Sequence, residues 1–210
     1  ALDGIILHKE CLDLKRRLPM RINRITQVSQ NEIVFNVHTE RKRTNLIISC
    51  HSLYNRIHIT DKDYTGYDEP SGFIMLLRKH ILNGIIEEII QEDYDRYLIL
   101  KIRALADLYD EKHYTLHVEL MGKYANIILV DNDGKVMDAL KRIPPFENNK
   151  RTIWPGAIFT YPEKQIKHDP FKVFTYDSTI SLVKQFKGFS PLLAKEIEYR
   201  LSTQSFEAIM

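Results

Sequence analysis

The stretch QEDYDRYLILKI, residues 91–102, decides how this chain is expected to fold. Its second half, RYLILKI, alternates along its length and is rich in leucine and isoleucine, which predicts a half-buried strand. The preceding run IIEEIIQ predicts another strand, and EDYD predicts the turn between the two. The second strand starts with an acid and a base side by side, Asp95 and Arg96, and that pair needs its own explanation.

Strand-like runs also lie on both sides of this hairpin. RINRITQV, NEIVFNVHT, TNLIISCH and RIHIT precede it, and HYTLHVELM, NIILVD and KVMDALKRI follow it. A first helix, over residues 2–19, has one apolar face made of Leu7, Cys11, Leu14 and Leu18. A second helix, over residues 70–84, starts at the N-cap Ser71, and Gly84 supplies the left-handed residue after Asn83.

The composition changes after residue 142. The run PPFENNKRTIWPG is rich in proline and asparagine, and the remainder has a helical pattern. We therefore predict an α+β chain in three parts: a mainly antiparallel β-rich domain (1–142), a linker or crossing segment (143–168) and a helical region (169–210). The last helical pattern stops without a cap, so we expect the sequence to be a piece of a longer protein.

Composition and charge narrow the class of protein. The 210 residues are 44% hydrophobic, and the formal net charge is only +2, which does not support a DNA-coating protein but permits a local basic face. Cys11 and Cys50 lack a CxxC partner and are interpreted as reduced core thiols of a cytoplasmic protein. The sequence shows no signal peptide and no apolar run of membrane-spanning length, so we expect no membrane insertion.

The sequence predicts neither catalysis nor a metal site. His113 and His117 share a strand face, but a third and a fourth ligand are missing. Glu87 and Glu88 are expected on opposite faces of their strand, in solvent. Because the chain also lacks a glycine-rich phosphate loop and a nucleophile elbow, we predict no catalytic residue, no metal and no cofactor.

The helical region has the layout of a helix-hairpin-helix. In LVKQFKGFSPLLAKEI, residues 182–197, Gly188 lies at the bend, Ser190 is the N-cap and Pro191 starts the second helix. Backbone N–H groups at such a turn face a phosphate, which makes Gly188, Ser190 and Lys195 candidate phosphate contacts. The alternative is a capped hairpin that only packs.

Tyrosines offer candidate surfaces for stacking on unpaired bases. The four candidates are Tyr54, Tyr94, Tyr97 and Tyr124. The alternative interpretation is that they are ordinary half-buried tyrosines.

Five segments resemble motifs of one known family. They are ISCHSLYNRIHIT (48–60), FIMLLRKHILNGIIEEIIQEDYDRYLIL (73–100), ELMGKYANIILVD (119–131), WPGAIFTYP (154–162) and GFSPLLAKEI (188–197). In this order, and over nearly the whole chain, they resemble the fibronectin-binding protein A and RqcH family, whose N-terminal domain is called NFACT-N. The resemblance implies a fold related to the N-terminal domain of formamidopyrimidine-DNA glycosylases, followed by a helix-hairpin-helix. Those glycosylases attack with an N-terminal proline amine, and Ala1 stands first here, so we expect no base excision.

The resemblance also implies a function in ribosome-associated quality control. Family members bind the large ribosomal subunit carrying a stalled peptidyl-tRNA, recruit charged tRNA and support the addition of C-terminal tails to the stalled chain. The same family is described as surface adhesins that bind fibronectin and fibrinogen. That role would place the protein at the cell surface without a recognisable signal or anchor.

The resemblance links individual residues to tRNA. An aspartate near the N-terminus and an Asp-Arg pair match Asp3, Asp95 and Arg96 here, and Asp3 is also the expected N-cap of the first helix. In a regular strand Asp95 and Arg96 would point to opposite faces, whereas a bent turn would relax that rule. A second candidate patch around Gly122, read as a bend or simply as a strand break, consists of Glu119, Lys123 and Asn126.

Overall fold

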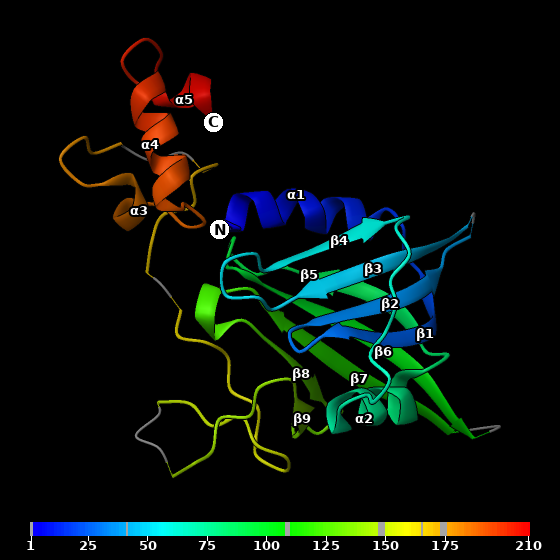
Figure 1. Ribbon diagram of the computed structural model, residues 1–210. Coiled ribbons are helices and arrows are strands. Elements are labelled where there is room, and N and C mark those ends of the chain that lie inside the picture. The colour runs from blue at the N-terminus through cyan, green and yellow to red at the C-terminus, as the bar shows by residue number, and fades with distance from the viewer. Residues whose placement is uncertain (1, 41, 108–109, 147–149, 165, 173–175) are drawn as a thin grey trace.

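The body of the protein is one antiparallel sheet in the order β4-β3-β2-β1-β5-β6-β7-β8-β9 (Figure 1). The computed structural model describes residues 2–40, 42–107, 110–146, 150–164, 166–172 and 176–210. The strands are β1 Met20–Ser29, β2 Glu32–His38, β3 Arg43–Ser49, β4 Arg56–Thr60, β5 Ile85–Ile90, β6 Tyr97–Asp107, β7 Asp110–Glu119, β8 Asn126–Val130 and β9 Val136–Ala139. The predicted α+β class and the antiparallel hairpin of β5 and β6 are confirmed.

The sheet bends where β1 meets β5. These two strands pair at only two positions, around Met20 and Ile86, and register shifts interrupt both strands nearby. Such irregularities bend a strand and increase its twist. Side chains from both halves, Phe35 of β2 and Leu116 of β7 among them, therefore share one buried core.

Helix α1, Gly4–Lys15, lies against β4 and β5 at one end of this body, whereas α2, Gly72–Ile81, lies at the other end (Figure 1). The predicted apolar face of α1 is confirmed for Leu7, Cys11 and Leu14, which are buried. Burying such a face is what holds a short helix in place, because isolated helices of this length are marginal in water.

The two ends of α2 compare differently with the prediction. Ser71 is the N-cap, as predicted. At the other end Asn83, not Gly84, has the left-handed backbone, with a φ of 64°. Gly84 is favoured for a different reason: a Cβ there would lie 2.9 Å from the carbonyl oxygen of Ile81 and 3.1 Å from that of Arg103.

A crossing segment leads from β9 to the helical region. Ile143 and Ile153 donate N–H groups to each other's carbonyl oxygens, and Ile153 is buried in a small core with residues of β8 and β9. The helical region contains α3 Leu182–Gln185, α4 Pro191–Arg200 and α5 Phe206–Ile209, with a small core of its own. The domain boundaries at residues 142 and 168 stay predictions. Of the described helices, none has the length and apolarity to cross a membrane.

Candidate nucleic-acid interface

Asp3 connects the starts of two helices that are far apart in the sequence. Its Oδ1 accepts the N–H of Ile6 at 2.8 Å, so it is the N-cap of α1, as predicted. Its Oδ2 accepts the hydroxyl of Ser190 at 3.3 Å, and Ser190 in turn caps α4 by accepting the N–H of Leu193 at 3.1 Å. Asp3 is 3% exposed, so its carboxylate is held by the protein.

Two glycines allow three chain segments to meet beside Asp3. The Gly4 N–H donates to the carbonyl oxygen of Gly188 at 3.1 Å. A Cβ on Gly4 would overlap the carbonyl oxygen of Tyr94 and lie 2.8 Å from the Cα of Gly188. Gly188, at the predicted bend, has a φ of 78°, a backbone angle that residues with a side chain rarely adopt. The start of α1, the β5–β6 turn and the turn before α4 therefore pack backbone against backbone.

The β5–β6 turn is fixed to α1 by Gln91. The Gln91 side-chain amide donates to the carbonyl oxygens of Gly4 and Asp95, both at 2.9 Å. Asp93 and Tyr94 have left-handed backbones, with φ angles of 51° and 57°. Left-handed non-glycine residues persist only where the surroundings hold them, so this turn has one enforced shape.

Asp95 and Arg96 line one pocket, of about 210 Å³, because β6 begins only at the next residue, Tyr97. The rule of opposite strand faces therefore does not apply to them. The same pocket is lined by Asp3, Lys167, Gly188 and Ser190. Arg96 makes no side-chain hydrogen bond or ion pair with any residue that the structure describes, Asp95 included.

The pocket carries mixed charge, because the carboxyl groups of Asp3, Asp95 and Glu163 line it together with the cations Arg96 and Lys167. Burial raises the pKa of the Asp95 carboxyl, and nearby Lys187 opposes that rise. Burial also lowers the pKa of Lys167, and the positive charge of Arg96 lowers it further. Within the described chain Lys167 has no ion pair either. Two cations that repel each other beside a pocket gain from an added anion such as a phosphate.

The predicted phosphate contacts lie beside this pocket. A second hollow, of about 490 Å³, is lined by Asp3, Ser190 and Lys195 among others. The Asp3 carboxylate already lies at the start of α4, where a phosphate would otherwise bind the helix N-terminus. Lys195 is exposed and adds positive charge at this edge. The phosphate role of Gly188, Ser190 and Lys195 stays a prediction.

The second predicted patch is not assembled into this pocket. Glu119 is 2% exposed and forms a two-point ion pair with Arg151, with N–O distances of 2.7 and 2.6 Å. Asn126 is also buried: its Nδ2 donates to the carbonyl oxygen of Lys141, and its Oδ1 accepts the N–H of Lys141. Lys123 alone is exposed, in the 3₁₀ turn Gly122–Tyr124. Their predicted tRNA contacts remain predictions, and the observed bonds of Glu119 and Asn126 hold the fold together.

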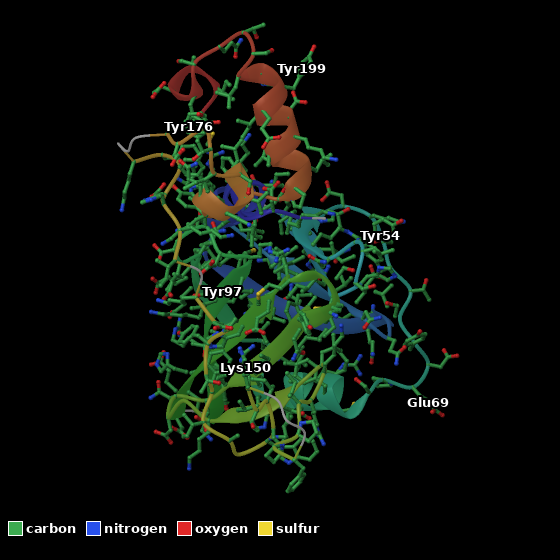
Figure 2. All side chains as sticks on the ribbon, turned by 90° about the vertical axis from the view of Figure 1, so that its left-hand side faces the viewer. Tyr54, Glu69, Tyr97, Lys150, Tyr176 and Tyr199 are labelled. Carbon is green, nitrogen blue, oxygen red and sulfur yellow. The ribbon has the colours of Figure 1, made fainter. Side chains whose placement is uncertain are left out.

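The four candidate tyrosines divide into two kinds. Tyr97 is 3% exposed, and Tyr94 packs on His8 with ring centroids 4.9 Å apart. Tyr54 is 67% exposed and Tyr124 is 71% exposed. Figure 2 places Tyr54 on the outer surface, well apart from Tyr97. Only Tyr54 and Tyr124 therefore present open rings to a ligand.

The sequence did not predict the roles of two residues: Lys167, which lines the Arg96 pocket, and Arg151, which pairs with Glu119. Both belong to the crossing segment, whose composition indicated only a linker, and no periodic pattern marks them. Among the described residues, no group of three or more His, Cys, Asp or Glu side chains is arranged so that it could bind a metal ion.

Comparisons with known proteins agree with one another. The family model for NFACT N-terminal and middle domains matches residues 3–209. A Bacillus subtilis protein named Rqc2 homolog RqcH is 37% identical over 213 residues, which cover 95% of this chain and 37% of that protein. The yeast ribosome quality control complex subunit 2 is 28% identical over 153 residues, covering 71% of this chain and 13% of that protein. The chain thus spans well under half of these relatives.

A solved structure has the same fold. The N-terminal part of a fibronectin/fibrinogen-binding protein from Streptococcus suis superposes with a TM-score of 0.89 at 33% sequence identity. The match covers 99% of this chain and 82% of that one.

We expect Gly4→Ala to destabilise the contact between α1, the β5–β6 turn and the helical region. The new methyl group overlaps the Tyr94 carbonyl oxygen, and such overpacking costs about 1–3 kcal/mol. Urea unfolding measures the loss. Gly72→Ala is the matched control, because Gly72 also starts a helix after its N-cap but has no atom within 4 Å of its added Cβ. Equal stability of the two variants would contradict the close packing.

Proposed function

Because the chain belongs to the NFACT N-terminal family, which it shares with Rqc2 and RqcH proteins, we propose that it is the RNA-binding part of a ribosome quality-control factor. In this proposal it engages tRNA and the large ribosomal subunit that carries a stalled peptidyl-tRNA. The addition of C-terminal tails belongs to the whole factor, of which this chain supplies a part. No catalytic residue of its own is required, since the role is to hold and position RNA.

The observation that carries the proposal is the unpaired Arg96 beside Lys167 in the pocket with Asp3 and Asp95. The planar guanidinium of Arg96 suits two oxygens of one phosphate. The Asp95 carboxylate, which repels phosphate, suits a ribose 2′-hydroxyl or a donor on a base edge. Asp3 is a positioning residue in this scheme, because both its oxygens are used to hold α1 and α4.

The helix-hairpin-helix turn would add backbone contacts around this pocket. Gly188 and Ser190 line it, and Lys195 extends the positive edge toward the exposed side of α4. Exposed Lys123 and the rings of Tyr54 and Tyr124 would meet bases that are not paired. The ammonium of Lys123 lies 5.0 Å from the centre of the Tyr124 ring, so charge and stacking surface come together there.

A second candidate function is adhesion to host matrix proteins. It is favoured by the structural match to the Streptococcus suis protein, whose name gives fibronectin and fibrinogen as ligands. The fold alone does not carry that activity across. Saturable binding of the 210-residue chain to immobilised fibronectin or fibrinogen that persists at raised salt would support it, and no binding would remove it from this part of the protein.

We expect Arg96→Ala to weaken binding of the chain to tRNA by about tenfold and to reduce the salt dependence of log K by about one unit, as loss of one phosphate contact requires. Fluorescence anisotropy at several salt concentrations measures both. Lys79→Ala is the control, because it removes one exposed charge from α2 at the opposite end of the molecule (Figure 1). If both variants bind tRNA as the parent does, Arg96 does not belong to the interface.

We expect the double change of Tyr54 and Tyr124 to alanine to weaken binding of single-stranded RNA by about 1–3 kcal/mol for each base that loses its stacking partner. Phenylalanine at both positions should restore binding, because it keeps the ring. Tyr199→Ala is the control, since Tyr199 is 77% exposed on α4. An equal loss for duplex RNA, which presents no unpaired bases, would argue against stacking.

A further inference from the structure

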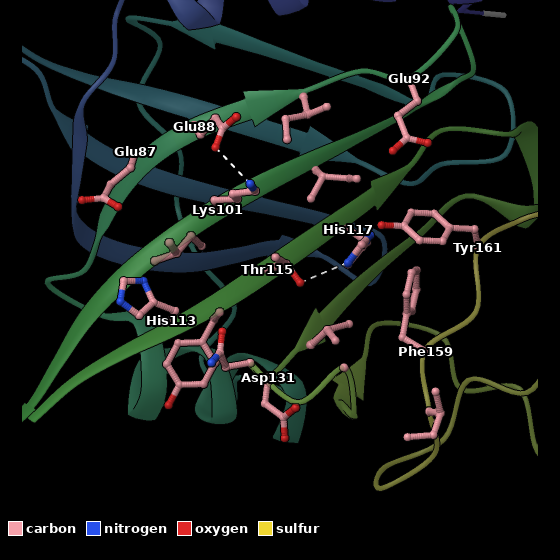
Figure 3. A pocket seen from close by; sticks show the side chains of 18 residues that line it. Glu87, Glu88, Glu92, Lys101, His113, Thr115, His117, Asp131, Phe159 and Tyr161 are labelled. Atoms are coloured by element: carbon pink, nitrogen blue, oxygen red, sulfur yellow. Dashed lines mark hydrogen bonds and ion pairs between the residues drawn. The ribbon is translucent and has the colours of Figure 1, made fainter.

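A larger hollow, drawn in Figure 3, lies on the outer face of strands β5 to β8. It shares no lining residue with the pocket around Arg96. The crossing segment covers one half of this face, where Arg151 pairs with Glu119 and where Phe159 and Tyr161 pack on His117. The uncovered half forms a trough of about 680 Å³. That volume lies in the range of small-molecule sites, about 300–1,000 Å³.

One end of the trough has an aromatic wall. The rings of Phe159 and Tyr161 lie with their centroids 4.0 and 5.7 Å from that of His117. Figure 3 shows these three side chains gathered at the same end as Glu92. The apolar residues that line the trough include the buried Ile99. An aromatic wall next to a carboxylate attracts a cation that carries an apolar body.

The charged groups of the trough are mainly acidic. Glu87 and Glu88 both line it, although strand alternation predicts opposite faces; an irregularity of β5 between Ile86 and Glu88 breaks the alternation. Lys101 is the one lysine or arginine among the described lining residues. The lining carboxylates are Glu87, Glu88, Glu92 and Asp131.

Existing bonds leave part of this negative charge without a partner. Lys101 pairs with Glu88 at 3.1 Å. Asp131 accepts two backbone N–H groups at 2.9 Å, and no described cation pairs with it. Glu87 pairs with Arg103 at 2.6 Å, and Glu92, which accepts the Tyr97 hydroxyl at 2.9 Å, pairs with Lys164 at 3.7 Å. Glu92 and Asp131 are half-buried, so solvent screens them less than Glu87 and Glu88.

His117 adds an independent sign of a ligand. Its side chain is 3% exposed and lines the trough; Nε2 lies 3.1 Å from the Thr115 hydroxyl, and Nδ1 has no partner in the described chain. Buried polar atoms without a partner are rare in folded proteins. Burial, reinforced by Arg151, lowers the pKa of His117 to about 4, so the ring is neutral at physiological pH. In the neutral tautomer whose Nε2–H donates to the Thr115 hydroxyl, Nδ1 accepts a hydrogen bond from an ammonium, whereas a charged ring would repel it.

We propose that this trough binds a small organic cation, a primary amine or guanidinium on a short aliphatic chain. The charged head lies between the aromatic wall and the carboxylate of Glu92, and the aliphatic chain runs over the apolar floor toward Asp131, which lies well apart from Glu92 (Figure 3). An N–H of the ligand satisfies the free nitrogen of His117. Anions are disfavoured by the same carboxylates.

Titration calorimetry with cadaverine and agmatine as probes tests the proposal, with 1,5-pentanediol as the neutral molecule of the same chain length as cadaverine. We expect saturable binding of the two cations and none of the diol. The double variant Glu92→Gln and Asp131→Asn should weaken cation binding about tenfold, because both changes remove charge and keep an acceptor oxygen for the existing hydrogen bonds. The ring ¹⁵N signals of His117 should shift on cation binding.

Asp63→Asn is the matched control, because Asp63 is exposed and lies outside the trough. Full binding by this control, together with weak binding by the double variant, supports the site. Equal binding of diol and cations overturns the proposal, as does an equal loss in the control. Unmoved His117 signals at saturation overturn it as well. None of these outcomes depends on whether Arg96 binds tRNA.

Discussion

The close approach of Gly4 to the Tyr94 carbonyl is the constraint on which the candidate RNA site depends. Because position 4 has no side chain, the start of α1 packs directly against the β5–β6 turn. The N–H of Gly4 donates to the carbonyl oxygen of Gly188 in the helical region. Gln91 then ties the same turn to the Gly4 carbonyl. The β5–β6 turn and the turn before α4, which are far apart in the sequence, are thereby both held around Asp3.

Charge pairing explains why Arg96 and Lys167 stand out in a chain of nearly neutral total charge. Neighbouring cations in this region already have acidic partners: Lys187 pairs with Asp93 and Lys164 with Glu92. Arg151, by contrast with Arg96, is fully committed to the buried Glu119. A buried two-point pair of this kind fixes structure and leaves no charge for a ligand. The free cations are therefore distinguished by their lack of partners, not by their number.

Much of the fold follows from the sequence because alternation and caps are local properties. The strands of the hairpin, the apolar face of α1 and the caps Asp3, Ser71 and Ser190 need only neighbouring residues to be recognised. Alternation cannot tell what covers the outer face of a sheet. The crossing segment covers it here, and its Arg151 pairs with Glu119, a bond that the alternation of the strand does not indicate. Lys167 was missed for the same reason, since tertiary packing alone brings it to Arg96.

The shape of the β5–β6 turn also determines which pocket is lined by Glu92 and which is lined by Asp95 and Arg96. Alternation assigned Asp95 and Arg96 to opposite faces, but the left-handed residues Asp93 and Tyr94 turn the chain before β6 begins, so both side chains reach one pocket. Glu92, at the start of the same turn, lines the trough on the outer sheet face instead. The Tyr97 hydroxyl donates to Glu92 while Tyr97 also lines the Arg96 pocket, so one tyrosine lies between that pocket and the trough. In this turn, whose shape the surroundings enforce, Glu92 and Arg96 lie a few residues apart and form no ion pair with each other.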